Sequence, residues 1–327
     1  MPLSTISPYM LSNATASGGT AAANAYIVYN STTGQVEWSA EASVAPSGPV
    51  SGYTSGGWVP GTSNIIDKFP FATNANATDV GDLTQGRYIS AGQSSTVSGY
   101  TSGGDAPTVV NTIDKFPFSA DANATDVGDL TVSRRSVAGQ SSTTSGYTSG
   151  GSTPVVNTID KFPFAADANA TDVGDLTAPR WGLAGQSSTE SGYSSGGTPP
   201  TVNTIDKFPF ASDGNASDVG DLTQGRYSVA GQSSSASGYT SGGYAPVNVN
   251  TIDKFSFAAD GNASDVGDLT QSRNASAGQS SSSSGYTSGG GFPIVNTIDK
   301  FPFSADANAS DVGNLTAGRR GPAGQQG

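Results

Sequence analysis

The chain of 327 residues contains no cysteine and no histidine. These absences remove disulfide bonds, thiolate nucleophiles, histidine acid–base chemistry and nearly every zinc, copper or haem site. Only 12% of the residues are charged, and 26 acidic against 14 basic residues give a net charge of −12 at pH 7. An acidic surface is a poor match for nucleic acid or an anionic membrane. We therefore expect no enzyme of the common classes and no nucleic-acid partner.

Long apolar segments are missing as well. No apolar run approaches the roughly 20 residues that a helix needs to cross a bilayer, and Met1 is not followed by a basic segment and an apolar core. The sequence thus predicts no membrane span and does not indicate a Sec-type secretory signal. The lack of cysteine is compatible with a cytosolic or virion assembly site and equally with a secreted bacterial protein.

Glycine is abundant, with 44 residues, and an internal repeat dominates the sequence. An Ile-Asp-Lys-Phe motif recurs at steps of 46 or 47 residues, with its aspartate at Asp67, Asp114, Asp160, Asp206, Asp253 and Asp299. A Ser-Gly-Tyr-x-Ser-Gly-Gly motif recurs in step with it, with its tyrosine at Tyr53, Tyr100, Tyr147, Tyr193, Tyr239 and Tyr286. The chain therefore divides into residues 1–50, outside the array, and six units in residues 51–327.

Each unit predicts four short β-strands. The unit between Arg134 and Thr177 has four segments, separated by Gly, Asn, Asp and Pro, at residues 136–142, 145–151, 157–164 and 172–177. Alternation in the third segment places Ile159, Lys161 and Pro163 on one face and Asp160, Phe162 and Phe164 on the other. No stretch shows helical periodicity over ten residues, and the Gly and Pro content argues against helix.

Four-stranded units of about 46 residues predict a β-propeller. The first unit begins at Ser51 without an Ala-Gly-Gln segment, whereas the chain ends with such a segment at residues 323–325 that has no successor. The two incomplete ends complement each other. We predict an all-β, six-bladed propeller in which the C-terminal strand completes the N-terminal blade and removes the open edges. A β-solenoid or a trimeric fibre is the alternative architecture.

The order of the segments resembles the kelch repeat. An Arg is followed by a small-residue strand, a strand ending in Gly-Gly, an Asn-x-Ile-Asp-x-Phe strand and a last strand, although that last strand has Val-Gly-Asp-Leu and no Trp. The near-identical units are also similar to propeller repeats in structural proteins of marine bacteriophages, particularly cyanophages. This resemblance covers residues 51–327 and implies a tail, fibre or capsid-decorating protein.

The six units differ from one another mainly in two places, the loop after Gly-Gly and the two residues after the Arg. In a propeller both places open onto the same face, while the tip between the first two strands varies less and stays polar. Aromatic residues on loops of a rigid scaffold suit protein interfaces and sugar rings. The sequence therefore predicts a binding face formed by Trp58, Tyr88, Trp181, Tyr227, Tyr244 and Phe292. The alternative is neutral drift of the loops.

The invariant positions favour a structural role. Glycine suits close packing or turns, Phe suits layers between blades, and we expect the repeated Asp and Lys to pair or to cap turns. One invariant turn, Asp121-x-Asn123-x-Thr125, has the oxygen spacing of a calcium loop. It lacks the glycine and the bidentate Glu of an EF-hand, so we favour a hairpin turn and expect no cofactor, with calcium as the alternative.

Residues 1–50 predict an anchoring arm. Residues 1–24 are of low complexity, residues 25–40 form two β-prone runs around a turn, and residues 42–50 predict a linker. The Tyr-Asn-x-x-Thr-Gly-x-Val-Glu-Trp pattern resembles short hairpins of phage tail and fibre proteins. An isolated hairpin is marginal in water, so we expect a partner subunit or the propeller to cover its apolar residues. These are Tyr26, Ile27, Val28, Val36 and Trp38.

The sequence is compatible with three functions. The first is a non-enzymatic structural or adhesion protein of a virion, held by residues 1–50 to other virion or surface subunits in an oligomeric assembly, with the propeller facing a neighbour, a host glycan or a receptor. The second is an extracellular, secreted, lectin-like module. The third, an enzyme, is disfavoured because kelch-like oxidases need copper ligands including His, and because the acidic residues repeat six-fold and form no single asymmetric pocket.

Overall fold

The computed structural model of the chain describes residues 26–30, 35–39 and 50–327. In the first part, β1 (Tyr26–Asn30) pairs antiparallel with β2 (Gln35–Ser39), and Ile27 lies opposite Trp38. The predicted hairpin is thereby confirmed. Its covering partner remains a prediction, and the low-complexity segment 1–24 and the linker, apart from Val50, lie outside the described residues.

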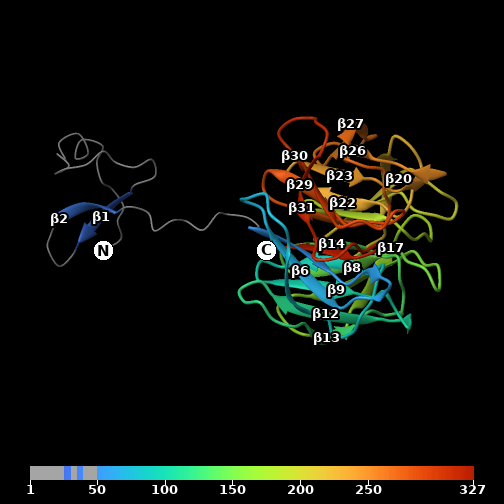
Figure 1. The fold of residues 1–327 in the computed structure, drawn as a ribbon, viewed down its shortest axis with the longest axis horizontal. Helices are drawn as coiled ribbons and strands as arrows, with labels where there is room; N and C mark the ends of the chain where they lie inside the picture. Colours follow the sequence, from blue (N-terminus) through green and yellow to red (C-terminus); the bar gives the residue numbers. More distant parts are fainter. Residues whose placement is uncertain (1–25, 31–34, 40–49) are drawn as a thin grey trace. The chain divides into compact units, whose positions relative to one another are not determined.

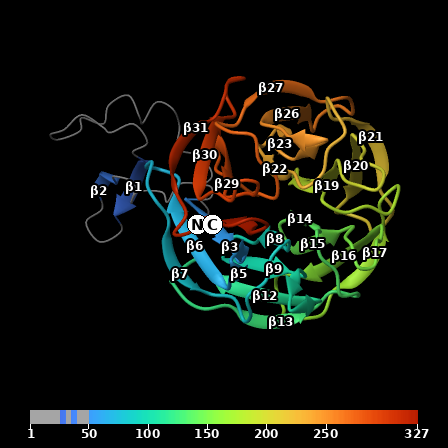
Figure 2. The same cartoon turned by 45° about the vertical axis from the view of Figure 1, so that its right-hand side comes forward.

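Residues 50–327 form six antiparallel sheets of four strands, which follow one another around a central axis as the blades of a propeller (Figures 1 and 2). Blade 3 shows the pattern: β14 (Ala138–Ser141) is innermost, followed outward by β15 (Ser145–Ser149), β16 (Thr158–Pro163) and β17 (Thr171–Asp175). The predicted all-β, six-bladed propeller is confirmed. No helix that could cross a bilayer occurs in the described residues.

The other five blades have the same order, from the innermost strand outward. Blade 1 has β32 (Ala323–Gln326), β3 (Ser51–Ser55), β6 (Ile65–Pro70) and β7 (Thr78–Asp82). Blade 2 has β8 (Ala91–Ser94), β9 (Ser98–Ser102), β12 (Thr112–Pro117) and β13 (Thr125–Asp129). Blade 4 has β18 (Ala184–Ser187), β19 (Ser191–Ser195), β20 (Thr204–Pro209) and β21 (Ser217–Asp221). Blade 5 has β22 (Ala230–Ser233), β23 (Ser237–Ser241), β26 (Thr251–Ser256) and β27 (Ser264–Asp268), and blade 6 has β28 (Ala277–Ser280), β29 (Ser284–Ser288), β30 (Thr297–Pro302) and β31 (Ser310–Asn314).

The ring closes where the sequence predicts. The C-terminal strand β32 pairs with β3 of blade 1, with Ala323 opposite Ser55, so that the blue and red ends of the propeller share one sheet (Figure 2). The main-chain N–H groups of Val50 and Ser51 both donate to the carbonyl oxygen of Gly327 at 2.8 Å. Closure therefore gives blade 1 its inner strand and covers the edge of β3 that would otherwise be unpaired.

Aromatic side chains pack between adjacent blades, as the alternation in the third strand predicts. In blade 3, Ile159 contacts the next blade through Phe208, whereas Phe162 contacts the preceding blade through Tyr100, with ring centroids 5.5 Å apart. The same layer recurs at the other blade boundaries. Burial of several aromatic rings per boundary contributes most of the apolar stabilisation of the ring.

Glycine in the second strand makes room for this layer. Gly146 lies opposite Phe162 in the paired strands of blade 3. A Cβ atom on Gly146 would come 2.3 Å from the Cζ atom of Phe162, well inside contact distance. The invariant Gly of the Ser-Gly-Tyr motif is therefore required because the aromatic ring lies flat over its backbone.

The repeated Asp and Lys do not pair with each other, in contrast to one of the expectations. They point to opposite faces of the blade. Asp160 forms a fully buried ion pair with Arg134 at 3.1 Å and accepts hydrogen bonds from the N–H and hydroxyl of Thr131. Lys161 instead reaches Asp213 of the next blade at 3.0 Å. Asp160 and Lys161 thus connect blade 3 to its two different neighbours. The ion-pair partner of the repeated Asp is the invariant Arg, to which the sequence analysis assigned no contact.

Candidate functional site

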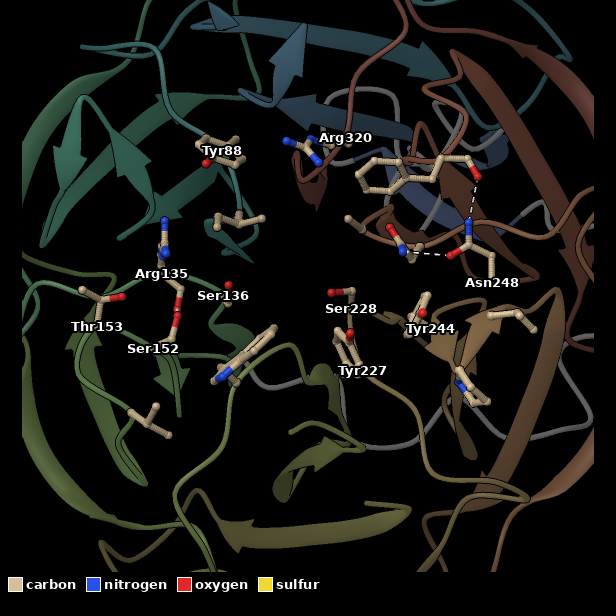
Figure 3. Close-up of a pocket in the computed structure, with 18 of the residues that line it drawn as sticks. Tyr88, Arg135, Ser136, Ser152, Thr153, Tyr227, Ser228, Tyr244, Asn248 and Arg320 are labelled. Atoms are coloured by element: carbon tan, nitrogen blue, oxygen red, sulfur yellow. Dashed lines mark hydrogen bonds between the residues drawn. The ribbon is translucent and has the colours of Figure 1, made fainter. Parts of the chain in front are cut away.

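A cavity of about 1140 Å³ opens at one end of the propeller axis (Figure 3). Its walls come from the loops between the second and third strands and from the segments that link one blade to the next. Five of the six predicted binding residues line it: Tyr88, Trp181, Tyr227, Tyr244 and Phe292. The sixth, Trp58, is not part of the wall and packs behind it, with its ring 5.3 Å from that of Tyr88.

Backbone pairing brings the two variable segments together. The residue after each invariant Arg forms an isolated antiparallel bridge with the residue after Gly-Gly in the adjacent loop, as in Tyr227 with Tyr244 and Trp181 with Thr198. Next to Trp181, the carbonyl of Arg180 accepts a hydrogen bond from the N–H of Gly151 at 2.9 Å. The predicted convergence of the two variable sets is confirmed, and the buried Arg is the anchor that holds the backbone there.

A closed ring of main-chain hydrogen bonds surrounds the axis at the cavity floor. One residue of each linking segment donates its N–H to the carbonyl of its counterpart in the preceding link, at 2.5–2.8 Å. The six residues are Ile89, Ser136, Gly182, Ser228, Ala275 and Gly321. All have positive φ, between 49° and 72°, which is uncommon for residues other than glycine. The hydrogen-bonded ring therefore fixes the wall residue that directly precedes each of these six positions in the sequence. The positive φ is unfavourable for the four members that are not glycine.

The aromatic residues of the cavity form two groups on different sectors of the ring. One group is Trp58 with Tyr88, and the other is Trp181, Tyr227 and Tyr244, with successive ring centroids 5.3 and 5.4 Å apart. Phe292 stands apart from both groups and is 62% exposed. Exposed or half-buried aromatic rings around a cavity provide flat apolar surfaces with polar edges, which suit a ring-shaped ligand or a protein loop.

Two asparagines form a polar sector between the aromatic groups. The Nδ2 group of Asn274 donates to Oδ1 of Asn248 at 2.9 Å, and Nδ2 of Asn248 donates to the carbonyl of Phe292 at 2.7 Å (Figure 3). Each amide retains further hydrogen-bonding capacity toward the cavity, because an amide group has two donor hydrogens and two acceptor lone pairs. The asparagines were variable positions in the sequence, but an aromatic criterion alone did not select them.

Two arginines, Arg135 and Arg320, also line the cavity and were likewise not among the predicted residues. The guanidinium of Arg135 forms an ion pair with Asp105, whose carboxylate also accepts a hydrogen bond from the Tyr88 hydroxyl at 3.3 Å. Arg320 lies against the rings of Phe292 and Trp58, at 5.0 and 5.8 Å from their centroids. Their position directly after the invariant Arg was the signal that could have identified them.

The opposite face of the propeller is different in character. It carries the tips between the first and second strands, in which Ser95, for example, caps its own turn by accepting hydrogen bonds from two backbone N–H groups. Val50 and Gly327 occupy the equivalent tip position in blade 1. The described part of the propeller chain therefore begins and ends on the face opposite the cavity.

In the turn Asp121-x-Asn123-x-Thr125, the alternative calcium site, side-chain oxygens accept hydrogen bonds from other parts of the protein. Oδ1 of Asp121 accepts a hydrogen bond from Nζ of Lys68 at 3.2 Å, and Oδ1 of Asn123 accepts one from the N–H of Asp82 at 3.0 Å. Thr125 begins strand β13. The described residues contain no group of three or more acidic side chains arranged to hold a metal ion. The turn thus joins blade 2 to blade 1.

No protein-family model matches the chain, and no curated protein matches it either. The fold and the cavity therefore define the class: the protein is an all-β, six-bladed β-propeller with a cavity at one end of its axis.

Proposed function

We propose that this protein is a non-enzymatic structural and adhesion component of a virion. In this proposal residues 1–50 attach it to another subunit, and the cavity face contacts a neighbouring protein, a host glycan or a receptor. One observation carries the proposal: the cavity wall is built from the positions at which six near-identical repeats differ. Neutral drift would also place large aromatic residues at the opposite tips, yet residues 96–97, 143–144, 189–190, 235–236 and 282–283 include none, whereas the cavity face has several.

The path of the chain supports an anchoring role for the arm. The propeller begins at Val50, on the face opposite the cavity. Residues 1–50 are therefore connected to the propeller at the face opposite the cavity. The kelch-like order of the strands and the likeness of the repeats to those of marine bacteriophage structural proteins favour a virion location.

The chemistry of the cavity supports binding without catalysis. None of the described residues that line it is a carboxylate, and the chain has no His or Cys. Asp105, which lies beside the wall, is neutralised by Arg135. General acid–base catalysis most often uses His, Asp or Glu, and a serine nucleophile needs an adjacent base. The six repeated aspartates of the Ile-Asp-Lys-Phe motif are used in contacts between blades.

A second candidate function is a secreted, lectin-like module that binds glycans. The two groups of aromatic rings favour it, because the face of an aromatic ring stacks well on the apolar face of a sugar. The two candidates use the same cavity and differ in whether the protein is attached to a particle.

Gold-labelled antibody and proteomics on purified particles, compared with the particle-free supernatant, distinguish the two candidates. We expect label at a fixed site on the particle, and loss of this label when residues 1–47 are deleted. Label only in the supernatant would favour the lectin-like module. Undiminished incorporation of the deletion variant would contradict the anchoring role of the arm.

A further inference from the structure

We infer that the cavity binds an acidic saccharide, whose carboxylate is held by Arg320 while its sugar rings lie against the aromatic wall. This inference rests on the proposed function, because it names the class of ligand that the adhesive face would take.

Only two basic residues lie outside the repeated Arg and Lys positions, and both line the cavity. Twelve of the 14 basic residues occupy the repeated Arg and Lys positions. There the six Arg are buried in ion pairs, five Lys pair with an Asp of the next blade, and Lys300 lies over the ring of Tyr286. The two that remain, Arg135 and Arg320, both line the cavity. In a chain of net charge −12, an anionic ligand needs a local cation to offset the general repulsion.

Arg135 and Arg320 occupy equivalent positions in the repeat, but only one of them is neutralised. Asp105 binds the guanidinium of Arg135, whereas no carboxylate of the described residues lies within ion-pair distance of Arg320. The Nε group of Arg320 is buried and has no hydrogen-bond partner among the described residues. An unpaired guanidinium next to a cavity provides both the charge and the free donors that a carboxylate needs.

Aromatic rings orient the guanidinium of Arg320. It lies between Phe292 and Trp58, both within the range of a cation–π contact. Such contacts limit the movement of a long side chain, so less conformational entropy is lost when it binds a ligand. Asn248 (Figure 3) and Asn274 line the same cavity, and their amide groups are of the type that binds hydroxyl groups.

The combination of groups favours a saccharide over other anions. A planar guanidinium matches the two oxygens of a carboxylate, amides match hydroxyl groups, and tyrosine and tryptophan rings match the faces of pyranose rings. A nucleic acid or another dense polyanion would meet a single unpaired cation at this cavity, in a strongly acidic protein. A saccharide with a single carboxylate on a ring places one negative charge beside several hydroxyl groups, as this cavity requires.

Titration calorimetry with the full-length protein tests the inference. The probes are an oligosaccharide that carries one uronic acid unit and the same oligosaccharide after reduction of its carboxyl group, which is a neutral ligand of equal length. We expect the acidic form to bind at least about tenfold more tightly, since a charge-assisted hydrogen bond has roughly that effect. Added salt should weaken binding of the acidic form only.

The matched variants are Arg320→Gln and Arg135→Gln, which remove equivalent side chains. We expect Arg320→Gln to lose at least about tenfold in affinity for the acidic form and to bind the neutral form as before. Arg135→Gln, whose guanidinium is already occupied by Asp105, should lose clearly less affinity for the acidic form than Arg320→Gln does. Arg320→Lys keeps the charge and loses the planar fork, so its affinity should fall between those of wild type and Arg320→Gln. Circular dichroism verifies that each variant is folded.

Three results would overturn the inference. Equal affinity of the wild type for both forms would show that the carboxylate is not recognised, and equal losses in Arg320→Gln and Arg135→Gln would remove the special role of Arg320. Absence of binding to either form would exclude this ligand class. None of these results affects the particle labelling, so the proposed virion role stands or fails separately.

Discussion

At the scale of single residues, the molecule is held together by charges buried between blades. Arg134 and Asp160 are both fully inaccessible, and burial lowers the pKa of the Arg134 guanidinium while Asp160 acts to raise it. Removing one partner of such a pair leaves an uncompensated charge in the interior. The exposed pair Lys161–Asp213 joins the same blade to its other neighbour, with Asp213 well solvated.

These two pairs predict different mutational effects. Asp160→Ala should reduce the free energy of unfolding by about 3–5 kcal/mol, because it leaves Arg134 buried and unpaired. Asp213→Ala, the control on the exposed pair, should cost about 0–1 kcal/mol. Denaturant unfolding of both variants measures the difference. Similar losses in the two variants would contradict the assignment of the Arg–Asp pair as the stronger contact.

The tyrosines and lysines between blades predict loss of stability at alkaline pH. Burial raises the pKa of the Tyr147 phenol above 10.0, and a hydrogen bond to Asp167 raises the pKa of Lys115 above 10.5. In both cases the folded state holds the proton more tightly, so the stabilisation is complete below the unfolded pKa and is lost as pH rises through the folded value. The tyrosines concerned are Tyr53, Tyr100, Tyr147, Tyr193, Tyr239 and Tyr286.

Phenolate absorbance and circular dichroism, recorded together from pH 9 upward, test this prediction. About half of the 12 tyrosines should ionise only in step with unfolding. Ionisation of all tyrosines in a single transition near pH 10, with the fold intact, would be inconsistent with their burial.

At the scale of elements, the strand β32 is the closing piece of the ring. Beyond its pairing with β3, it carries Gln325, whose Nε2 donates to the carbonyl of Tyr100 and to the hydroxyl of Thr101 in blade 2 at 3.0 Å. Equivalent glutamine bonds join every blade to the next, so the loss of this strand breaks both a sheet and the cycle of contacts around the axis.

Deletion of residues 323–327 should therefore lower the thermal unfolding midpoint by about 10 °C or more, since it removes one strand and two blade contacts. Deletion of residues 1–47, which lie outside the propeller, should leave the midpoint within about 2 °C. Differential scanning calorimetry measures both. An unchanged midpoint after removal of β32 would show that closure contributes little.

The strands and the closure could be predicted from sequence because the same pattern occurs six times and its two incomplete halves stand at the ends of the array. The ion pairs could not, because Arg134 and Asp160 are 26 positions apart and meet only when two blades pack. The binding site could be predicted only in part, because some of its contacts also join residues that are far apart in the sequence. Variation located the loops, but residue type alone favoured the aromatics, and the roles of Arg320 and Asn248 depend on neighbours from other blades.

At the scale of the whole molecule, the propeller has no unique starting blade. Three residues separate the first two strands in blade 2, from Ser95 to Val97, and in blade 1 the corresponding positions include only Gly327 and Val50. One residue inserted between Gly327 and Val50 would therefore give blade 1 a three-residue tip like those of the other blades.

A circular permutant tests this equivalence. Val50 is joined to Gly327 through one inserted serine, and new ends are opened between Thr143 and Thr144, at an exposed tip of blade 3. We expect a folded protein whose thermal midpoint lies within about 5 °C of that of residues 50–327 in their natural order, because circular permutation succeeds at exposed loop tips. An insoluble permutant would indicate that closure through β32 has a special role in folding.

The ring of main-chain hydrogen bonds at the cavity floor has a consequence for the exchange of amide protons. A ladder of bonds between strands frays from its ends, but a cycle has no end, and opening any one bond requires a displacement of the links on both sides. The six amides of Ile89, Ser136, Gly182, Ser228, Ala275 and Gly321 should therefore exchange with deuterium together and slowly. They would form a protected group of amides next to an open cavity, in contrast to the amides of mobile loops, which open at almost no free-energy cost.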